Sequence, residues 1–314
     1  YFSIFGFSKI AGGSDEALRF FSAFWATAAV VLFVAATGSA FSLPGRLFAA
    51  ALATGSNFWF YQAQNARFYA LGFFIATAIL VISMALLRPR QRREPPASRR
   101  VALLFGLMLF GSFMHFYLMY LSLAVLIVIG LLEPRLRLVM AALALVLVSL
   151  AFLYLKVVIG TYAQFRVENS WMGESPDWYI YQLNAARQLM FNKWALLAIA
   201  VCAGAWLLRI VLGRDASVAE PSQPPAGEST LLVLGPWHGR LDPAAALVIG
   251  VPLIMLAGGI VSSILISPNF QDRNFLVCAP FLWGATAKLY DVGVQALAPR
   301  LRLLANFALA LAVL

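Results

Sequence analysis

The stretch FYALGFFIATAILVISMALL, residues 68–87, contains no charged side chain, although Arg67 precedes it and Arg88 follows it. About 20 apolar residues in an α-helix span ~30 Å, which is the thickness of the hydrocarbon core of a bilayer. Water-soluble helices of this length alternate apolar and polar faces, and this stretch does not. It therefore predicts a transmembrane helix and, with it, a membrane protein.

The composition of the whole chain supports this class. Of the 314 residues, 62% are hydrophobic and 11% are charged, and the mean hydropathy is +0.84. A soluble domain has about 25% charged residues, so this chain could not hide its apolar surface from water. The net charge of +10 comes from Arg and Lys in short gaps between apolar runs, which argues against a nucleic-acid partner. Cys202 and Cys278 each lie inside an apolar run and are predicted to be ordinary core cysteines.

Apolar segments of spanning length recur along the chain and predict an all-α bundle of about ten transmembrane helices. They lie at about 17–37, 44–62, 68–88, 101–115, 116–132, 138–156, 194–212, 244–266, 275–297 and 301–314. We divide the run 101–132 at His115, because it is too long for one helix. We expect residues 1–314 to form a single transmembrane domain that is truncated at both ends, since the chain starts at Tyr1 and stops at Leu314 inside an apolar run.

Basic residues orient this bundle. Arginines crowd the gap 88–100, mark the gap 133–137, flank 213–243 and mark the last gap with Arg300 and Arg302, so these gaps are predicted to be cytoplasmic. Strict alternation then places other segments on the opposite, outer face, and these are 1–16, 62–67, 157–193 and 267–274. The segment 213–243 is rich in proline and poor in apolar residues, so we expect a flexible cytoplasmic loop.

The outer loop 157–193 is rich in Trp and Tyr. Ser175, Pro176 and Asp177 have the order of a helix start, with a capping hydroxyl, a first-turn proline and an acid near the positive end of the helix dipole. The sequence predicts that an amphipathic helix follows at about 177–191. Two interpretations stay open: an aromatic anchor lying on the interface, or a lid that faces substrate.

Polar groups are costly at a membrane rim, so those on the outer face are candidates for function. Arg67 lies beside Gln64 and Tyr69, and its guanidinium could bind a phosphate with two hydrogen bonds or extend to lipid headgroups. Arg273 could complete a two-arginine phosphate clamp. The other candidates on this face are Asp15, Glu16, Arg19, His115 and Tyr117. Lys288 and Asp291, three residues apart in one span, are predicted to neutralise each other.

Five stretches in order along the chain resemble the GT-C type membrane glycosyltransferases, which include protein mannosyltransferases and the lipid A aminoarabinose transferase. They are GGSDEALRFFSA (12–23), QNARFYAL (64–71), HFY (115–117), the Trp-containing loop 169–191 and DRNFLVCAP (272–280). Asn65 stands where an acid is common in that family. Motifs of soluble catalysis, such as a phosphate-binding glycine loop, a nucleophile elbow or an HExxH metal site, do not occur in the sequence.

The resemblance implies a polyprenyl-phosphate sugar donor, used on the periplasmic or extracellular face of a bacterial plasma membrane, and a glycan, lipid or protein acceptor. It assigns Arg67, Tyr69 and Arg273 to the donor phosphate and gives Asp15, Glu16, Arg19, Gln64, His115 and Tyr117 supporting places. The catalytic acid is expected upstream of Tyr1, and a divalent metal ion is a candidate cofactor. The alternative interpretations are a polytopic transporter or lipid-linked-sugar flippase, or a polymerase or ligase of surface polysaccharide.

Overall fold

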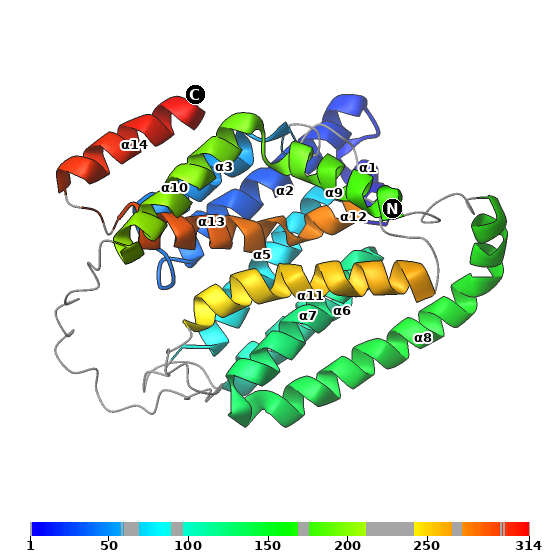
Figure 1. The fold of residues 1–314 in the computed structure, drawn as a ribbon. Helices are drawn as coiled ribbons and strands as arrows, with labels where there is room; N and C mark the ends of the chain where they lie inside the picture. The colour runs from blue at the N-terminus through cyan, green and yellow to red at the C-terminus, as the bar shows by residue number, and fades with distance from the viewer. Residues whose placement is uncertain are drawn as a thin grey trace.

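The computed structural model is all-α and describes residues 2–57, 59, 69–88, 97–168, 176–211, 242–265, 272–295, 297 and 299–313 (Figure 1). In chain order its helices are α1 (Phe2–Ala11), α2 (Asp15–Ala36), α3 (Leu43–Thr54), α5 (Tyr69–Leu86), α6 (Ala97–Met114), α7 (Phe116–Leu132), α8 (Arg137–Glu168), α9 (Pro176–Met190), α10 (Lys193–Val211), α11 (Pro243–Leu265), α12 (Asp272–Phe275), α13 (Ala279–Gly293) and α14 (Pro299–Val313). The 3₁₀ turns η1 (Pro134–Leu136) and η2 (Leu276–Cys278) precede α8 and α13. Gln64, Arg67 and most of the predicted cytoplasmic loop 213–243 lie outside the described residues.

The protein is a helical multi-pass membrane protein. Within the described ranges, four helical segments are long and apolar enough to cross a bilayer, namely Asp15–Ala36, Tyr69–Leu86, Pro134–Leu153 and Pro243–Ile264. A fifth is formed if α9 and the following segment Lys193–Leu207, which meet at 87°, are counted as one broken span. The described residues therefore show four or five of the about ten predicted spans. Other predicted spans correspond to shorter helices, such as the 17-residue α7 and the 12-residue α3.

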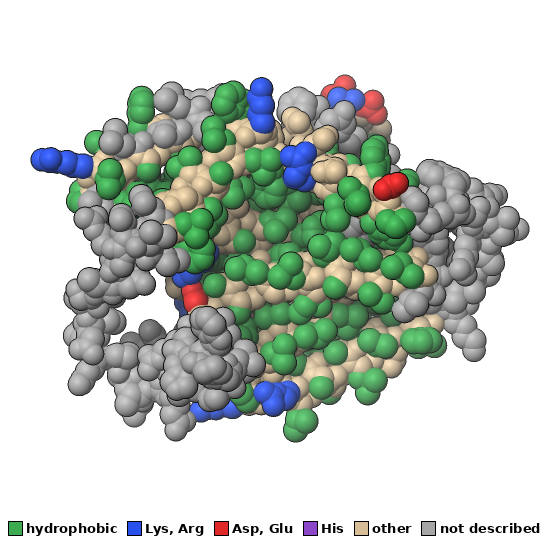
Figure 2. Space-filling model, viewed as in Figure 1, with side chains coloured by type: hydrophobic (Ala, Val, Ile, Leu, Met, Phe, Trp, Pro, Cys, Tyr) green, Lys and Arg blue, Asp and Glu red, His purple; other side chains and the backbone are tan. Residues whose placement is uncertain are grey.

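The spanning helices differ in how deeply they are buried. α5, the stretch on which the fold class rests, is 72% buried and packs against α2, α6, α7 and α13. The stretch Pro134–Leu153 is only 11% buried and packs mainly on α7. Hydrophobic side chains cover much of the outer surface of the bundle, as Figure 2 shows for one face. That surface is what a helical bundle must present to lipid.

Helix α13 is the point at which several helices approach one another closely, and glycines make these approaches possible. A Cβ added to Gly284 would lie 2.6 Å from Cγ1 of Val248 on α11. A Cβ on Gly293 would overlap the backbone carbonyl oxygen of Cys202 on α10. Cys202 and Cys278 are free and buried, which confirms the prediction that they belong to the core.

Several predicted boundaries are confirmed and others move. The long run 101–132 is broken at His115, as predicted, because α6 ends at Met114 and α7 begins at Phe116. In the predicted span 44–62, α3 ends at Thr54, and its last turn closes with Gly55 donating to the carbonyl of Ala51 at 2.9 Å, while residues 58 and 60–62 lie outside the described residues. The outer loop predicted from residue 157 is helical as far as Glu168 of α8.

The predicted pairing of Lys288 with Asp291 is wrong. Lys288 forms an ion pair with Asp242, just before α11. Asp291 accepts hydrogen bonds from the backbone N–H of Ser42 at 2.9 Å and from the Ser42 hydroxyl. Spacing along α13 allowed a local pair, but the start of α3 offers unsatisfied N–H donors, and a carboxylate at a helix N-terminus satisfies them.

These contacts define one end of the bundle, which we call the arginine end. There α5, α7 and α13 finish while α6, α8 and α11 begin. Arg100 at the start of α6 donates to the carbonyl of Ala85 in the last turn of α5 at 2.9 Å. The arginines described at this end near α5 to α8 are Arg88, Arg99, Arg100, Arg135 and Arg137. The opposite end, where α5, α7 and α13 begin, is the aromatic end.

Candidate functional site

The aromatic end brings together side chains from two of the predicted motifs. Tyr69 is the first residue of α5, and His115 joins α6 to α7. The two rings meet edge to face, with centroids 5.6 Å apart. The ring of Tyr117, in the first turn of α7, lies 6.1 Å from that of His115. Tyr69 and Tyr117 are 7% and 1% exposed, so this group is packed rather than displayed on the surface.

The backbone at His115 explains why the long apolar run breaks there. His115 is extended, with φ −154° and ψ 129°, and its Nδ1 accepts a hydrogen bond from the backbone N–H of Tyr117 at 3.2 Å. The side chain therefore caps α7, in the way that Ser or Asn usually does. An Nδ1 atom that accepts has no proton, which assigns the neutral imidazole with its hydrogen on Nε2.

Further aromatic side chains of α7 and α9 lie next to the group formed by Tyr69, His115 and Tyr117. The ring of Tyr120 lies 5.3 Å from that of Tyr117 at 88°, and 4.7 Å from that of Phe116. Tyr179 of α9 is close enough to Tyr117 to interact with it electrostatically. Edge-to-face packing of this kind holds rings in fixed orientations. The hydroxyl-bearing rings of α5 and α7 thus gather around His115, with Tyr179 of α9 nearby.

Helix α9 is amphipathic, as predicted for residues 177–191. Gln182, Ala186 and Met190, each four residues apart, are buried against the bundle, while Ile180 and Tyr181 are exposed. The helix turns by 87° into the segment Lys193–Leu207 of α10, so the two lie almost perpendicular to each other. The structure confirms the amphipathic pattern, and the choice between interfacial anchor and substrate lid stays a prediction.

Helix α12 contains the start of the last predicted motif, residues 272–280, and lies at the aromatic end. It contacts α9, and the adjoining turn η2 contacts both α5 and α7. This places the backbone of Arg273 near the elements that hold Tyr69 and His115. The side chain of Arg273, like Gln64 and Arg67, lies outside the described part of the structure. The two-arginine phosphate clamp therefore remains a prediction.

The acidic motif begins helix α2. Asp15 and Glu16 are exposed in its first turn, and Ser14 caps the helix by accepting from the N–H of Ala17 at 3.2 Å. Arg19, one turn further on, attracts Glu16 electrostatically, so these two residues interact locally. Trp25 of α2 packs on Phe74 of α5 with ring centroids 4.8 Å apart, so α2 lies against α5.

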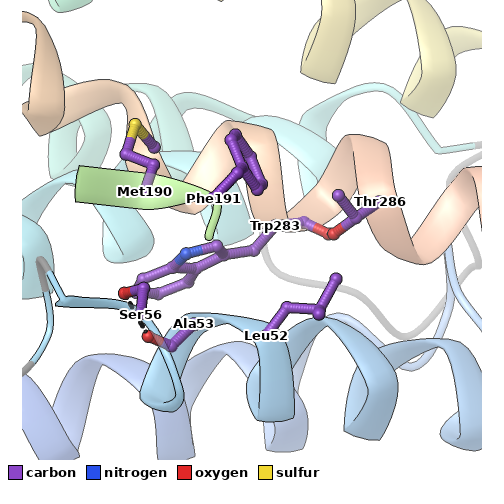
Figure 3. Close-up of a pocket in the computed structure, with 7 residues that line it drawn as sticks. All are labelled: Leu52, Ala53, Ser56, Met190, Phe191, Trp283 and Thr286. Atoms are coloured by element: carbon purple, nitrogen blue, oxygen red, sulfur yellow. Dashed lines mark hydrogen bonds between the residues drawn. The ribbon is translucent and has the colours of Figure 1, made fainter. Parts of the chain in front are cut away.

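A small cavity lies under the corner between α9 and α10, and sequence reasoning did not find it (Figure 3). Its volume is about 10 Å³, which is room for about one water molecule. The Ser56 hydroxyl donates to the carbonyl of Ala53 at 2.6 Å, and the Thr286 hydroxyl donates to that of Trp283 at 2.8 Å. The lining residues are Leu52, Ala53, Ser56, Met190, Phe191, Trp283 and Thr286.

No sequence signal marks these cavity residues, because a Ser or Thr that bonds to its own helix is common in apolar segments. Among the side chains that the structure describes, no three His, Cys, Asp or Glu residues group as metal ligands. The described ring contacts at the aromatic end join phenols and an imidazole to apolar rings.

The chain matches no protein-family model, no curated protein and no solved structure. The likeness to GT-C enzymes thus rests on the five sequence stretches, and function must be argued from the residues and their placement.

Proposed function

We propose that this protein is a membrane glycosyltransferase that moves a sugar from a polyprenyl-phosphate donor to a glycan, lipid or protein acceptor on the outer face of a bacterial plasma membrane. The contact between Tyr69 and His115 supports this proposal most strongly. These residues belong to two separate stretches that resemble the GT-C family. The placement of α9 and α12 at the same end adds the elements of two further stretches.

In this proposal the bundle has about ten spans, and the aromatic end faces outward. A polyprenyl phosphate lies with its chain in the membrane and its phosphate at the rim, where headgroup-depth residues can reach it. Arg67 and Arg273 bind the phosphate oxygens, and the Tyr69 hydroxyl donates to one of them. The ring of His115 is held by its hydrogen bond to the N–H of Tyr117, and it packs against one side of Tyr69.

The reaction breaks the bond between the anomeric carbon and the phosphate oxygen while an acceptor hydroxyl or amine attacks that carbon. The acceptor proton passes to a carboxylate that acts as general base, and the electron pair of the broken bond stays on the phosphate. Two guanidinium groups stabilise the charge of this leaving group. A divalent metal ion is an alternative source of that positive charge.

The test is turnover of a labelled polyprenyl-phosphate sugar by the purified full-length protein. Arg67→Ala and Arg273→Ala should each lower release of polyprenyl phosphate by at least about 100-fold, as expected when a charge-stabilising donor is removed. Arg99→Ala is the matched control, because Arg99 is exposed at the arginine end, away from the proposed site. Full turnover by both site variants would show that the phosphate is bound elsewhere.

A transporter or flippase is the second candidate, and Pro252 inside α11 favours it together with the sharp bend between α9 and α10. Interrupted helices are typical of transporter binding sites. Against it, Lys288 pairs with Asp242 where α11 begins, so it is not an unpaired charge inside the bundle. Movement of donor across reconstituted vesicles without sugar transfer would favour the transporter.

A further inference from the structure

One face of α7 is left open between its neighbours. The residues Phe116, Tyr120, Leu123, Ile127 and Leu131 recur every three or four positions, and each is partly or largely exposed. The exposed fractions reach 46% at Ile127 and 56% at Leu131, whereas most other residues of α7 are buried. An apolar helix that packs on several sides thus keeps one stripe uncovered, and we call it the α7 stripe.

Helices α8 and α11 form the two sides of this stripe. A Cβ on Gly250 of α11 would lie 3.3 Å from Cγ2 of Val128, and a Cβ on Gly130 would lie 3.5 Å from Cβ of Met140 on α8. At 100° per residue, Ile127 and Leu131 project between the directions of Gly130 and Val128. The α7 stripe is therefore the floor of a groove between α8 and α11, and Figure 1 shows α7 lying between these two helices.

Exposed arginines stand where this groove reaches the arginine end. Arg135 in η1 and Arg137 at the start of α8 follow directly on the last turn of α7. Nε of Arg137 donates to the carbonyl of Gly130 at 3.3 Å, which holds the guanidinium beside Leu131. Figure 2 shows Lys and Arg side chains at the lower edge of this apolar face, where α8 begins. Glu133 is the acidic residue described in the connection between α7 and α8.

We propose that this groove binds one anionic phospholipid, with its headgroup phosphate on Arg135 and Arg137 and one acyl chain along the α7 stripe. The planar guanidinium donates two hydrogen bonds to a phosphate, and basic residues next to a bilayer attract anionic headgroups. The adjoining apolar floor identifies a lipid rather than a free phosphate ion, because inorganic phosphate would make no use of Ile127 and Leu131. This site is separate from the aromatic end, so it can be tested without knowing the activity.

The experiment is native mass spectrometry of the full chain, titrated with phosphatidylglycerol or with phosphatidylcholine of the same acyl chains. We expect about a tenfold preference for the anionic lipid at the first bound equivalent. Arg135→Gln combined with Arg137→Gln should remove most of this preference, while Arg137→Lys should keep part of it. Leu131→Trp should lower binding of both lipids, since it fills the groove without changing charge.

Controls distinguish this site from general attraction of lipid to a basic protein. Arg19→Gln combined with Arg187→Gln removes two exposed arginines elsewhere and should leave the preference unchanged. Arg135→Gln alone keeps the bond from Arg137 to Gly130, so it tests the headgroup site even if the double variant fails to fold. Equal binding of the two lipids, unchanged binding in the Arg135→Gln protein, or displacement by millimolar inorganic phosphate would each overturn the proposal.

Discussion

The two ends of the bundle satisfy their polar groups in different ways. At the arginine end, charged side chains bind the termini of neighbouring helices, as Arg100 of α6 does by donating to the carbonyl of Ala85 in the last turn of α5 at 2.9 Å. At the aromatic end, the described contacts join an imidazole to phenol rings, with Tyr179 of α9 nearby. Charges that are already bonded to helix ends hold the bundle together. At the aromatic end, edge-to-face packing holds the rings in place instead.

The largest effect should come from breaking the close packing at the arginine end. Gly293→Ala places a Cβ onto the carbonyl of Cys202, and because that neighbour is backbone it cannot move aside as a side chain could. We expect the free energy of unfolding to fall by about 3 kcal/mol, which is at the upper end of overpacking effects, or the protein not to fold. Thermal unfolding in detergent measures it. Gly258→Ala in α11 is the control, because nothing lies within 4 Å of its Cβ position; an equal loss there would contradict the explanation.

The next effect tests the bond between α13 and α3. Asp291→Ala removes the acceptor of two hydrogen bonds from Ser42 and leaves that helix start unsatisfied. We expect the free energy of unfolding, measured in the same way, to fall by about 2 kcal/mol. Asp291→Asn keeps an oxygen for the Ser42 N–H and should lose less. If Lys288→Ala destabilised the protein in the same way and the two changes were not additive, the pairing predicted from sequence would be right after all.

A smaller stability effect, with a larger effect on turnover, should follow at the aromatic end. His115→Ala removes the cap of α7, which costs about 1 kcal/mol. His115→Asn restores an acceptor for the N–H of Tyr117 but not the ring that packs on Tyr69. We therefore expect His115→Asn to recover stability but not activity in the polyprenyl-phosphate assay. Recovery of both would mean that His115 serves only as a cap.

The smallest stability effect is expected on the outer side of α9. Tyr181 is 66% exposed, so Tyr181→Ser should change stability by less than about 0.5 kcal/mol. The substitution removes an aromatic ring from the exposed face of α9, and this face would lie among lipid headgroups if α9 is an interfacial helix. Fluorescence quenching of Trp178 by lipids with labelled headgroups should fall in this variant if α9 lies on the interface. Unchanged quenching would favour a lid.

Much of the architecture could be read from the chain because membrane insertion is a local property. The apolar stretch of α5, the break at His115 and the amphipathic helix after Ser175 each follow from a short window of sequence, and the structure agrees with all three. The partners of Lys288 and Asp291 could not be read in this way, since they come from α11 and α3. The cavity at Trp283 was missed for the same reason, because its walls come from three separate parts of the chain.

The sequence by itself determined that this protein is a multi-pass membrane protein, since 20-residue runs without charge need lipid around them. It also placed His115, Tyr117 and Tyr69 at helix ends. Tertiary structure decided which ends meet, which glycines allow close approach and which stretches stay exposed. The apolar stretches Tyr69–Leu86 and Pro134–Leu153 look alike as sequence, and yet 72% of the first and 11% of the second is buried. Lipid and protein interior are almost equally apolar, so hydrophobicity cannot distinguish a helix at the centre from one at the edge.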